Sequence, residues 1–326
     1  MEKDKIVSGF FNNYKIVILL MVTISLLLSI AIYFVFFRTG DLPEVDMNDV
    51  VKKNEIAQSE DSTIYLRVAV GAMISPEITF EYYQELMNLI ANKIGMKVKF
   101  FQHRTYEEVN DLVKNRLVDV AYVCSGAYTM GFEDFGMEIL AVPVVSGRKT
   151  YNCYIISNSE SGIESFQDLK GKRFAFTDPN SNTGYLVPIY MLAKIGETPD
   201  SFFKETFFTY SHDNSIKSIA DKQSDGAAVD GMIWDFFNSL SPLMVSRTKI
   251  IERSPPYGIP PIVVHPEMDK RFKKKLRKIF LSLHLDEKSK FLLDQIHIDR
   301  FEAGEPSMYD TIIEMRNWIK EMKTKK

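Results

Sequence analysis

One stretch decides how the rest of this chain is interpreted: Asp178-Pro-Asn-Ser-Asn-Thr-Gly-Tyr-Leu-Val-Pro188. The apolar run Arg173–Phe176 before it predicts a buried strand, and the apolar spacing of Leu186–Ile195 after it predicts a helix. The first amides of a helix have no intrahelical acceptor and carry partial positive charge. Ser181 and Thr183 add neutral hydroxyl donors. This corner is therefore typical of an anion-binding site.

The same residues also fit a simpler interpretation, a helix cap followed by a turn. The stretch contains no Lys or Arg, so an anion held there would be released more easily than from an arginine clamp. No Gly-Lys-Ser/Thr follows, which excludes a Walker-type nucleotide loop.

Length and composition limit the class of protein. The chain has 326 residues, of which 45% are hydrophobic, enough for two compact lobes. Its formal net charge of -3 gives no basic field for nucleic acid, which we do not expect as a partner. Cys124 and Cys153 lack metal-ligand spacing and lie in apolar runs, so we expect two buried thiols. A disulfide remains the alternative if the folded part is exported.

The N-terminal region predicts a membrane anchor. Ile16–Phe37 is uncharged and long enough to cross a bilayer, and the lysines before it favour a cytoplasmic N-terminus with an extracytoplasmic body. We therefore expect a cytoplasmic stub and transmembrane helix in residues 1–38. A cleaved signal peptide is the alternative for this segment. Residues 39–63 are acidic and polar, which predicts a tether.

The folded body, from residue 64 onward, begins with strand and helix patterns in alternation. The order β-α-β-α-β over residues 64–123 predicts a mostly parallel sheet with ligands outside the carboxyl ends of its strands. Tyr122 lies at the end of the third strand, where it is either a core aromatic or a ligand contact.

The alternation restarts in residues 158–253. Three strands there end in the polar segments Asp178–Gly184, Ser211–Asp213 and Asp230–Gly231. Parallel strands bring such segments to one edge of a sheet. The sequence therefore predicts that the three segments converge.

These residues carry a family resemblance. The segment Thr177–Pro188, with Leu169–Phe176 before it and Tyr210-Ser-His-Asp213 after it, resembles the phosphonate-, phosphite- and phosphate-binding proteins of ABC transporters. The resemblance implies the two-lobed α/β fold of type II periplasmic binding proteins, with crossovers near Tyr151–Ser157 and Pro256–Val264. Residues 64–157 and 254–326 would form lobe 1, and residues 158–253 lobe 2.

The resemblance also implies the site. Ser181, Asn182 and Thr183, with the following amide of Gly184, would hold the phosphoryl oxygens. His212 would contact them from a neighbouring loop, where the alternative is a histidine hydrogen-bonded to Asp213. The remaining members of the implied site are Tyr122, reaching across from lobe 1, and the rim residues Asp213 and Asp230. No cofactor and no metal are implied.

Two departures from the family pattern bear on the ligand. Met232 and Pro260 stand where binders of aminoalkylphosphonates place acidic groups, which favours phosphate, phosphite or a simple alkylphosphonate. The anchor is the second departure, because family members are commonly free in the periplasm or lipid-anchored. A titrating His212 would make capture depend on pH.

The same residues also bear on two rival functions, an enzyme and a sensor. Ser181, His212 and Asp213 are the residue types of a hydrolase triad, but no Gly-x-Ser-x-Gly elbow is present, and the histidines lack metal-site spacing. We therefore expect no enzyme. We expect a membrane-tethered, extracytoplasmic solute-binding protein that delivers a phosphorus oxyanion to an ABC permease. The alternative is a tethered sensor that signals to a separate membrane partner such as a histidine kinase.

Overall fold

The computed structural model describes residues 64–324, apart from the side chains of residues 76–81 and 323–324. The predicted membrane span at Ile16–Phe37 and the acidic tether lie outside the described residues. Among the helices within residues 64–324, none has both the length and the apolar character that a bilayer crossing requires.

The first sheet has six strands in the order β13-β4-β12-β3-β1-β2. The predicted alternation is confirmed, since β1, β2 and β3 pair in parallel, while the other three strands run antiparallel to their neighbours. The strands are β1 (Tyr65–Val70), β2 (Lys97–Gln102), β3 (Val120–Tyr122), β4 (Glu138–Val144), β12 (Ile262–Val264) and β13 (Arg300–Glu302).

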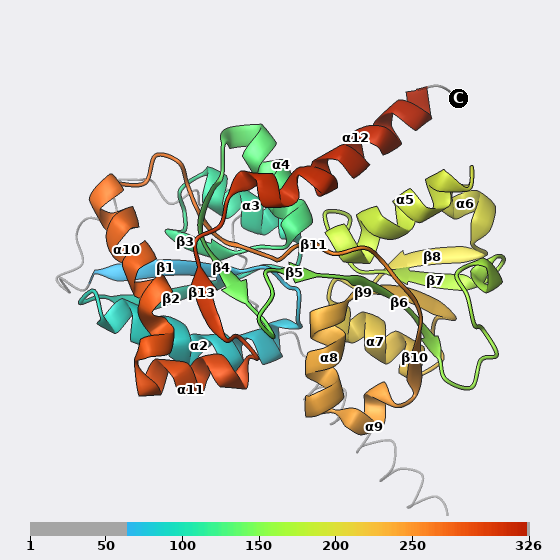
Figure 1. The fold of residues 1–326 in the computed structure, drawn as a ribbon, viewed down its shortest axis with the longest axis horizontal. Coiled ribbons are helices and arrows are strands. Elements are labelled where there is room, and N and C mark those ends of the chain that lie inside the picture. Colours follow the sequence, from blue (N-terminus) through green and yellow to red (C-terminus); the bar gives the residue numbers. More distant parts are fainter. Residues whose placement is uncertain (1–63, 325–326) are drawn as a thin grey trace, which may run out of the picture. The chain divides into compact units, whose positions relative to one another are not determined.

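Helices cover both faces of this sheet, with α3 and α4 on one side and α2 and α11 on the other (Figure 1). A capping box between Thr105 and Glu108 fixes the start of α3. The helices are α2 (Pro76–Asn92), α3 (Tyr106–Lys114), α4 (Ser125–Phe135), α10 (Lys270–Ser282), α11 (Glu287–Gln295) and α12 (Asp310–Thr324), with the short turns η3 (Leu283–Leu285) and η4 (Pro306–Tyr309).

The second sheet has five strands in the order β10-β6-β9-β7-β8. Its strands β7, β8 and β9 are parallel neighbours, which brings their carboxyl ends to one edge as predicted. The strands are β6 (Cys153–Asn158), β7 (Arg173–Phe176), β8 (Glu205–Phe208), β9 (Gly226–Asp230) and β10 (Thr248–Arg253). The helical segments are η1 (Gln167–Leu169), η2 (Asn182–Leu186), α5 (Val187–Lys194), α6 (Pro199–Phe202), α7 (His212–Ala220), α8 (Gly231–Leu240) and α9 (Pro242–Val245).

The two sheets are connected by a short antiparallel ladder, β5 (Thr150–Tyr151) with β11 (Tyr257–Gly258). It lies between the sheets in Figure 1. The first predicted crossover extends to Ser157, but the structure places the residues from Cys153 onward inside the second sheet. Every residue of β6 is buried because β9 and β10 flank it on both sides. A continuous apolar run is typical of such a central strand.

An aromatic cluster lies beneath the polar edge of the second sheet. The rings of Phe174 and Phe203 stack with their centroids 4.4 Å apart, and Phe166 stacks on Phe202 at 5.4 Å. Burying each such ring stabilises the fold by about 1.5–3 kcal/mol.

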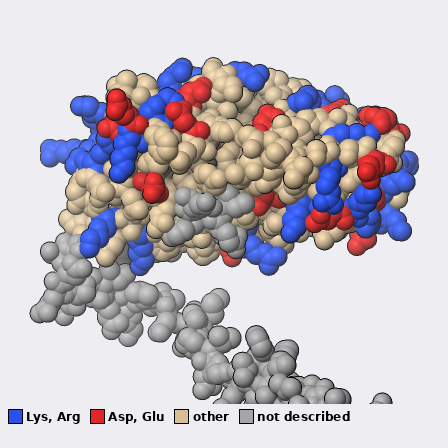
Figure 2. Space-filling model, turned by 90° about the horizontal axis from the view of Figure 1, so that it is seen from below, with Lys and Arg blue, Asp and Glu red and all other residues tan. Residues whose placement is uncertain are grey.

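Surface charge is mixed on the face seen in Figure 2, where Lys and Arg side chains are interspersed with Asp and Glu. Arg67 with Asp119 and Arg173 with Asp225 are two of the ion pairs. Exposed pairs of this kind contribute little stability. That face presents no field of a single sign that would attract nucleic acid.

Candidate ligand-binding site

The stretch after β7 forms a tight turn rather than an open loop. Ser181 caps the π-helical turn η2, and its Oγ accepts a hydrogen bond from the amide of Gly184 at 3.0 Å. A Cβ atom on Gly184 would lie 2.4 Å from the Cβ of Thr177, so only glycine fits there. The cap interpretation of this stretch is thus confirmed. The Gly184 amide, expected to hold a phosphoryl oxygen, is instead bonded to Ser181, because a capping side chain satisfies one of the first amides of a turn.

Two side chains of η2 carry polar atoms without a partner among the described residues. Asn182 and Thr183 are fully buried. Asn182 donates through Nδ2 to the hydroxyl of Tyr151 at 3.2 Å, but its Oδ1 and the Oγ1 of Thr183 have no hydrogen bond. Buried polar atoms are nearly always paired, so such atoms indicate a place that a ligand or water fills.

His212 is held as a neutral hydrogen-bond donor. Its Nδ1 accepts from the backbone amide of Asp230 at 3.1 Å, so the ring proton of the neutral form is on Nε2. That Nε2 is buried and has no partner in the described part of the chain. Burial lowers the pKa of His212 to about 3. The expected titration of His212 near neutral pH is therefore wrong, because its burial disfavours the charged form.

Asp213 connects the two lobes. Its Oδ1 accepts from the amide of Ser75 at 2.9 Å, and the neighbouring amide of His212 donates to the carbonyl of Met73 at 3.0 Å. The His212 ring contacts the Thr177 hydroxyl and the Asp230 amide, so the alternative pairing of His212 with Asp213 is not the one formed.

Asp230 ends β9 and caps α8. Its Oδ1 accepts from the amides of Met232 at 2.8 Å and Ile233 at 3.4 Å. The residue is buried, and burial raises its pKa to about 7. Together with Tyr122 and Pro260 it lines an inner cavity of about 20 Å³. Both amides donate to Oδ1 and neither to the second carboxyl oxygen, Oδ2.

Tyr122 is a core aromatic that also lines a cavity. It is buried at the end of β3, and its ring centroid lies 5.7 Å from that of Tyr83. It also lines the inner cavity opposite Asp230, and so brings a lobe 1 side chain to the polar edge of lobe 2.

Backbone from the two lobes meets directly beside η2. A Cβ atom on Gly126 of α4 would lie 2.4 Å from the carbonyl oxygen of Asn180 and 2.7 Å from the amide of Asn182. The amide of Tyr106 donates to Oδ2 of Asp178 at 3.1 Å. The described conformation is therefore closed, with the predicted site residues at the contact between the lobes.

Three further residues belong to this region. Ser211 opens the predicted segment Ser211–Asp213 but was given no role of its own, and Tyr106 and Tyr151 were not predicted as site residues. Tyr106 and Ser211 are buried with unpartnered hydroxyl oxygens, and Tyr151 contacts Asn182. A signal existed for Tyr106, because it starts the helix that follows β2 and so lies at a carboxyl edge. The same position rule applies to Ser211 after β8. The rule that ligands bind at the carboxyl ends of parallel strands does not predict Tyr151 as a site residue.

Two hinged α/β lobes that enclose unpaired polar groups define the class of two-lobed binding proteins. The comparison with solved structures supports that fold. A binding protein component of an ABC phosphonate transporter from Pseudomonas aeruginosa superposes with a TM-score of 0.76 and 24% identity, covering 80% of this chain and 88% of that one.

The chain belongs to the family of periplasmic substrate-binding proteins of phosphonate ABC transporters, whose model matches residues 68–309. The resemblance stated from the residues Thr177–Pro188 and Tyr210–Asp213 is thereby confirmed. Family members are binding components of transporters, which also confirms the prediction of a binding protein in place of an enzyme.

Two curated proteins of this kind are similar to the chain in sequence. The phosphonates-binding periplasmic protein of Escherichia coli is 26% identical over 217 residues, which cover 65% of this chain and 64% of the relative. A probable phosphite-binding protein of an ABC transporter from Prochlorococcus marinus is 30% identical over 164 residues, which cover 48% of this chain and 55% of the relative. The chain thus spans less than two thirds of the length of the curated relatives it matches.

Proposed function

We propose that this protein captures a small phosphorus oxyanion outside the cytoplasmic membrane and delivers it to an ABC permease. The observation that carries the proposal is the group of buried, unpartnered polar atoms where the lobes meet: Thr183 Oγ1, His212 Nε2 and the Tyr106 hydroxyl. Each is a neutral group that can donate to a phosphoryl oxygen.

The neutral character of these groups suits a carrier. His212 cannot carry a permanent positive charge at neutral pH, and the stretch 178–188 contains no Lys or Arg. An anion held by neutral donors loses less on release than one in a bidentate arginine clamp. The proposed role of Ser181, Asn182 and Gly184 is to shape the turn that positions the Thr183 hydroxyl.

Asp230 supplies selectivity for protonated anions in this proposal. When ionised, its carboxylate accepts the proton of a P–OH group, and when neutral it donates to a phosphoryl oxygen. Sulfate has no proton to offer, so at a pH above about 7, where Asp230 is ionised, sulfate would lie against an unpaired carboxylate lone pair. Asp213 has a different proposed role, since its carboxylate stabilises the closed lobes through Ser75.

The relatives support this class of ligand. The two curated relatives are named for the binding of phosphonates and of phosphite. Both are phosphorus oxyanions with at least two terminal oxygens, the feature that the donors of lobe 2 would recognise.

Transport is proposed over sensing because the matched family is one of transport components. The family description places such proteins in the periplasm, so the body is proposed to lie outside the cytoplasmic membrane. Anchoring through Ile16–Phe37 completes the proposal and rests on the sequence of that segment.

Titration calorimetry on the full chain in detergent tests the proposal. Phosphite, phosphate and methylphosphonate are the ligands, and sulfate is the control anion. We expect saturable binding of at least one phosphorus ligand and binding at least ~10-fold weaker for sulfate, the cost of about one unpaired buried group. The absence of binding to all three phosphorus ligands would remove the proposal.

A further inference from the structure

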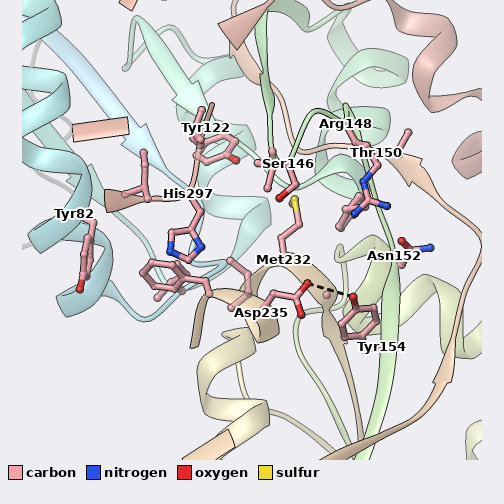
Figure 3. A pocket seen from close by; sticks show the side chains of 18 of the residues that line it. Tyr82, Tyr122, Ser146, Arg148, Thr150, Asn152, Tyr154, Met232, Asp235 and His297 are labelled. Atoms are coloured by element: carbon pink, nitrogen blue, oxygen red, sulfur yellow. Dashed lines mark hydrogen bonds between the residues drawn. The ribbon is translucent and has the colours of Figure 1, made fainter. Parts of the chain in front are cut away.

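The pocket between the lobes belongs to the proposed ligand site. It has a volume of about 150 Å³ and shares the walls Tyr122 and Met232 with the inner cavity. Figure 3 shows Met232 pointing into this pocket, with Tyr122 on one side and Arg148 and Asn152 on the other. The proposed ligand therefore explains this pocket. It does not explain a second group of charged residues, which lies on helix α10.

Helix α10 presents basic residues along its exposed side. Its sequence, Lys270–Ser282, contains no Asp or Glu. Leu276 and Phe280 are fully buried and define the side that packs against the body. Five exposed basic residues lie on the outer side of the helix, within an arc of about 140°. The basic face of α10 consists of Lys270, Arg271, Lys274, Lys275 and Lys278.

The acidic residues beside α10 do not neutralise its basic face. Glu138 pairs with Lys273, on the half-buried side of the helix, and Glu267 pairs with Arg116. Asp269 caps the helix by accepting a hydrogen bond from a backbone amide. Among the residues that the structure describes, none forms an ion pair with a member of the basic face. The face therefore keeps its positive charge.

This arrangement disfavours the helix, so solubility alone does not explain it. Like charges four residues apart destabilise a helix, and the basic face contains three such pairs. Lys270 and Arg271 also lie in the first turn, where the helix dipole disfavours cations. A surface that serves only solubility mixes charges of both signs, as the face in Figure 2 does. A face of one sign on one helix instead indicates an anionic partner.

Helix α10 lies at the edge of the first sheet where the chain enters the folded body. Its Lys273 contacts Glu138, the first residue of β4. Strand β4 runs in the same direction as β1, because β12 lies between β3 and β4 and is antiparallel to both. Three strand spacings, about 14 Å, separate β4 from β1. The start of β1 and α10 therefore share one edge, at the end of lobe 1 that faces away from lobe 2 (Figure 1).

The proposed membrane anchor would keep a lipid surface within reach of this edge. Residues 38–63, 26 in all, separate the predicted span from the folded body. A random chain of that length spans about 25–30 Å. Attraction between exposed charges extends over about 10 Å in ~0.1 M salt, so α10 must approach the headgroups closely to bind them. The length of the predicted tether permits such an approach.

We infer that the basic face of α10 binds the anionic phospholipid headgroups of the membrane that anchors the chain. The inference rests on the proposed function, because the anchor brings the headgroups within reach. Lysine suits such a surface, since its ammonium group is a compact charge on a flexible stem and needs no partner of fixed geometry. The interaction is electrostatic, so high salt abolishes it. Its effect is to hold the body against the membrane on the side of lobe 1.

Fluorescence quenching by a lipid headgroup tests the inference on the full chain. Leu285→Cys, three residues beyond α10 and 77% exposed, carries the fluorophore, while the native Cys124 and Cys153 are buried and stay unlabelled. The vesicles contain a nitroxide-headgroup lipid in either phosphatidylcholine alone or phosphatidylcholine with phosphatidylglycerol at about 2:1. We expect at least ~2-fold stronger quenching in the anionic vesicles in ~0.1 M salt, and no difference in ~1 M salt.

Two charge reversals locate the contact. Lys274→Glu with Lys275→Glu should reduce the quenching in anionic vesicles to that in phosphatidylcholine alone. The matched control is Lys172→Glu with Lys204→Glu, at two exposed lysines of lobe 2, which should leave the quenching unchanged. A fluorophore at Leu243→Cys, on α9 of lobe 2 and 85% exposed, should be quenched equally in both kinds of vesicle. Methylphosphonate affinity should stay the same in both double variants, because neither pair lies at the ligand site.

The outcomes separate this inference from the function on which it rests. Loss of the protein from phosphatidylcholine vesicles would remove the proposed anchor, and the quenching in anionic vesicles would still decide the inference. Equal quenching in the two kinds of vesicle would overturn the inference and leave an acidic protein as the partner of α10. The inference is also overturned if the lobe 2 reversals weaken quenching as much as the α10 reversals, or if the label on α9 is quenched as strongly as the one beside α10.

Discussion

The two lobes contribute different chemistry to the region where they meet. Lobe 2 supplies polar groups at the ends of three parallel strands, including Thr183, His212 and Asp230. Lobe 1 lines the inner cavity mainly with apolar side chains, among them the rings of Tyr83 and Tyr122. This difference indicates a division of labour, in which lobe 2 binds the anion and lobe 1 closes over it and excludes water. The predictions below test the two halves of that division separately.

Closure is tested by a change in lobe 1 that leaves every donor in place. Gly126→Val would put side-chain carbon atoms against the backbone of Asn180, so the lobes could not meet. If less than about 1% of the molecules close, the apparent affinity falls at least ~100-fold. Calorimetry with methylphosphonate measures the loss.

Met130→Val is the control for that experiment. It introduces the same β-branched residue at an exposed position of α4. Circular dichroism should show both variants folded, because the clash exists only between the lobes. Wild-type affinity in Gly126→Val would contradict the closed conformation as the binding state.

The donors of lobe 2 are tested by Thr183→Val, which keeps the shape and removes the unpartnered hydroxyl. Leaving an oxyanion lone pair without a donor costs about 1–3 kcal/mol, which is roughly a 5- to 150-fold weaker affinity. Thr206→Val, on the exposed edge strand β8, is the matched control. Equal affinities for both variants would place the anion elsewhere.

The pH dependence tests Asp230. Burial raises its pKa to about 7, so the carboxyl group is neutral at pH 6 and ionised at pH 8. A dianionic ligand should therefore bind more weakly at pH 8, by up to ~10-fold. Asp230→Asn should remove this decline. The titration of the ligand is common to both proteins, so their difference isolates Asp230.

The raised pKa of Asp230 also predicts how the stability of the folded protein changes with pH. Because the folded pKa lies above the unfolded value of about 3.9, the contribution of Asp230 to stability is fully present below pH ~4 and is lost as the pH rises through 7. Asp230→Asn should therefore raise the melting temperature more at pH 8 than at pH 5. An equal shift at both pH values would contradict the raised pKa.

The smallest expected effect concerns the contact between the lobes. Asp213→Ala removes the hydrogen bond to the Ser75 amide, worth about 0.5–1.5 kcal/mol, so affinity should fall roughly 2- to 12-fold. Asp213→Asn retains an acceptor oxygen and should recover most of this loss. If Asp213→Ala weakens binding as strongly as Thr183→Val, Asp213 contacts the ligand directly.

Much of the fold was predictable because it depends on local patterns. The alternation of strands and helices and the convergence of the segments after β7, β8 and β9 follow from apolar periodicity and parallel pairing. The sequence did not predict which sheet contains β6, because a short apolar run is compatible with a strand in either sheet. Only the pairing of β6 with β9 and β10 decides between them.

The site was predictable in its residue types but not in their states. The motif identified Thr183 and His212, yet the neutral form of His212 depends on its burial and on the Asp230 amide, which lies 18 residues away along the chain. The role of Asp213 likewise depends on Ser75, which is 138 residues distant in sequence. Contacts between residues so far apart in sequence form only in the folded protein, so local sequence patterns do not predict them.

The most direct test of the central claim is a crystal structure of the protein with methylphosphonate. The account predicts phosphoryl oxygens within hydrogen-bond distance of Thr183 Oγ1 and His212 Nε2, with the methyl group directed past Met232. A phosphoryl group bound elsewhere, or one in the cleft that contacts neither of these atoms, would contradict it.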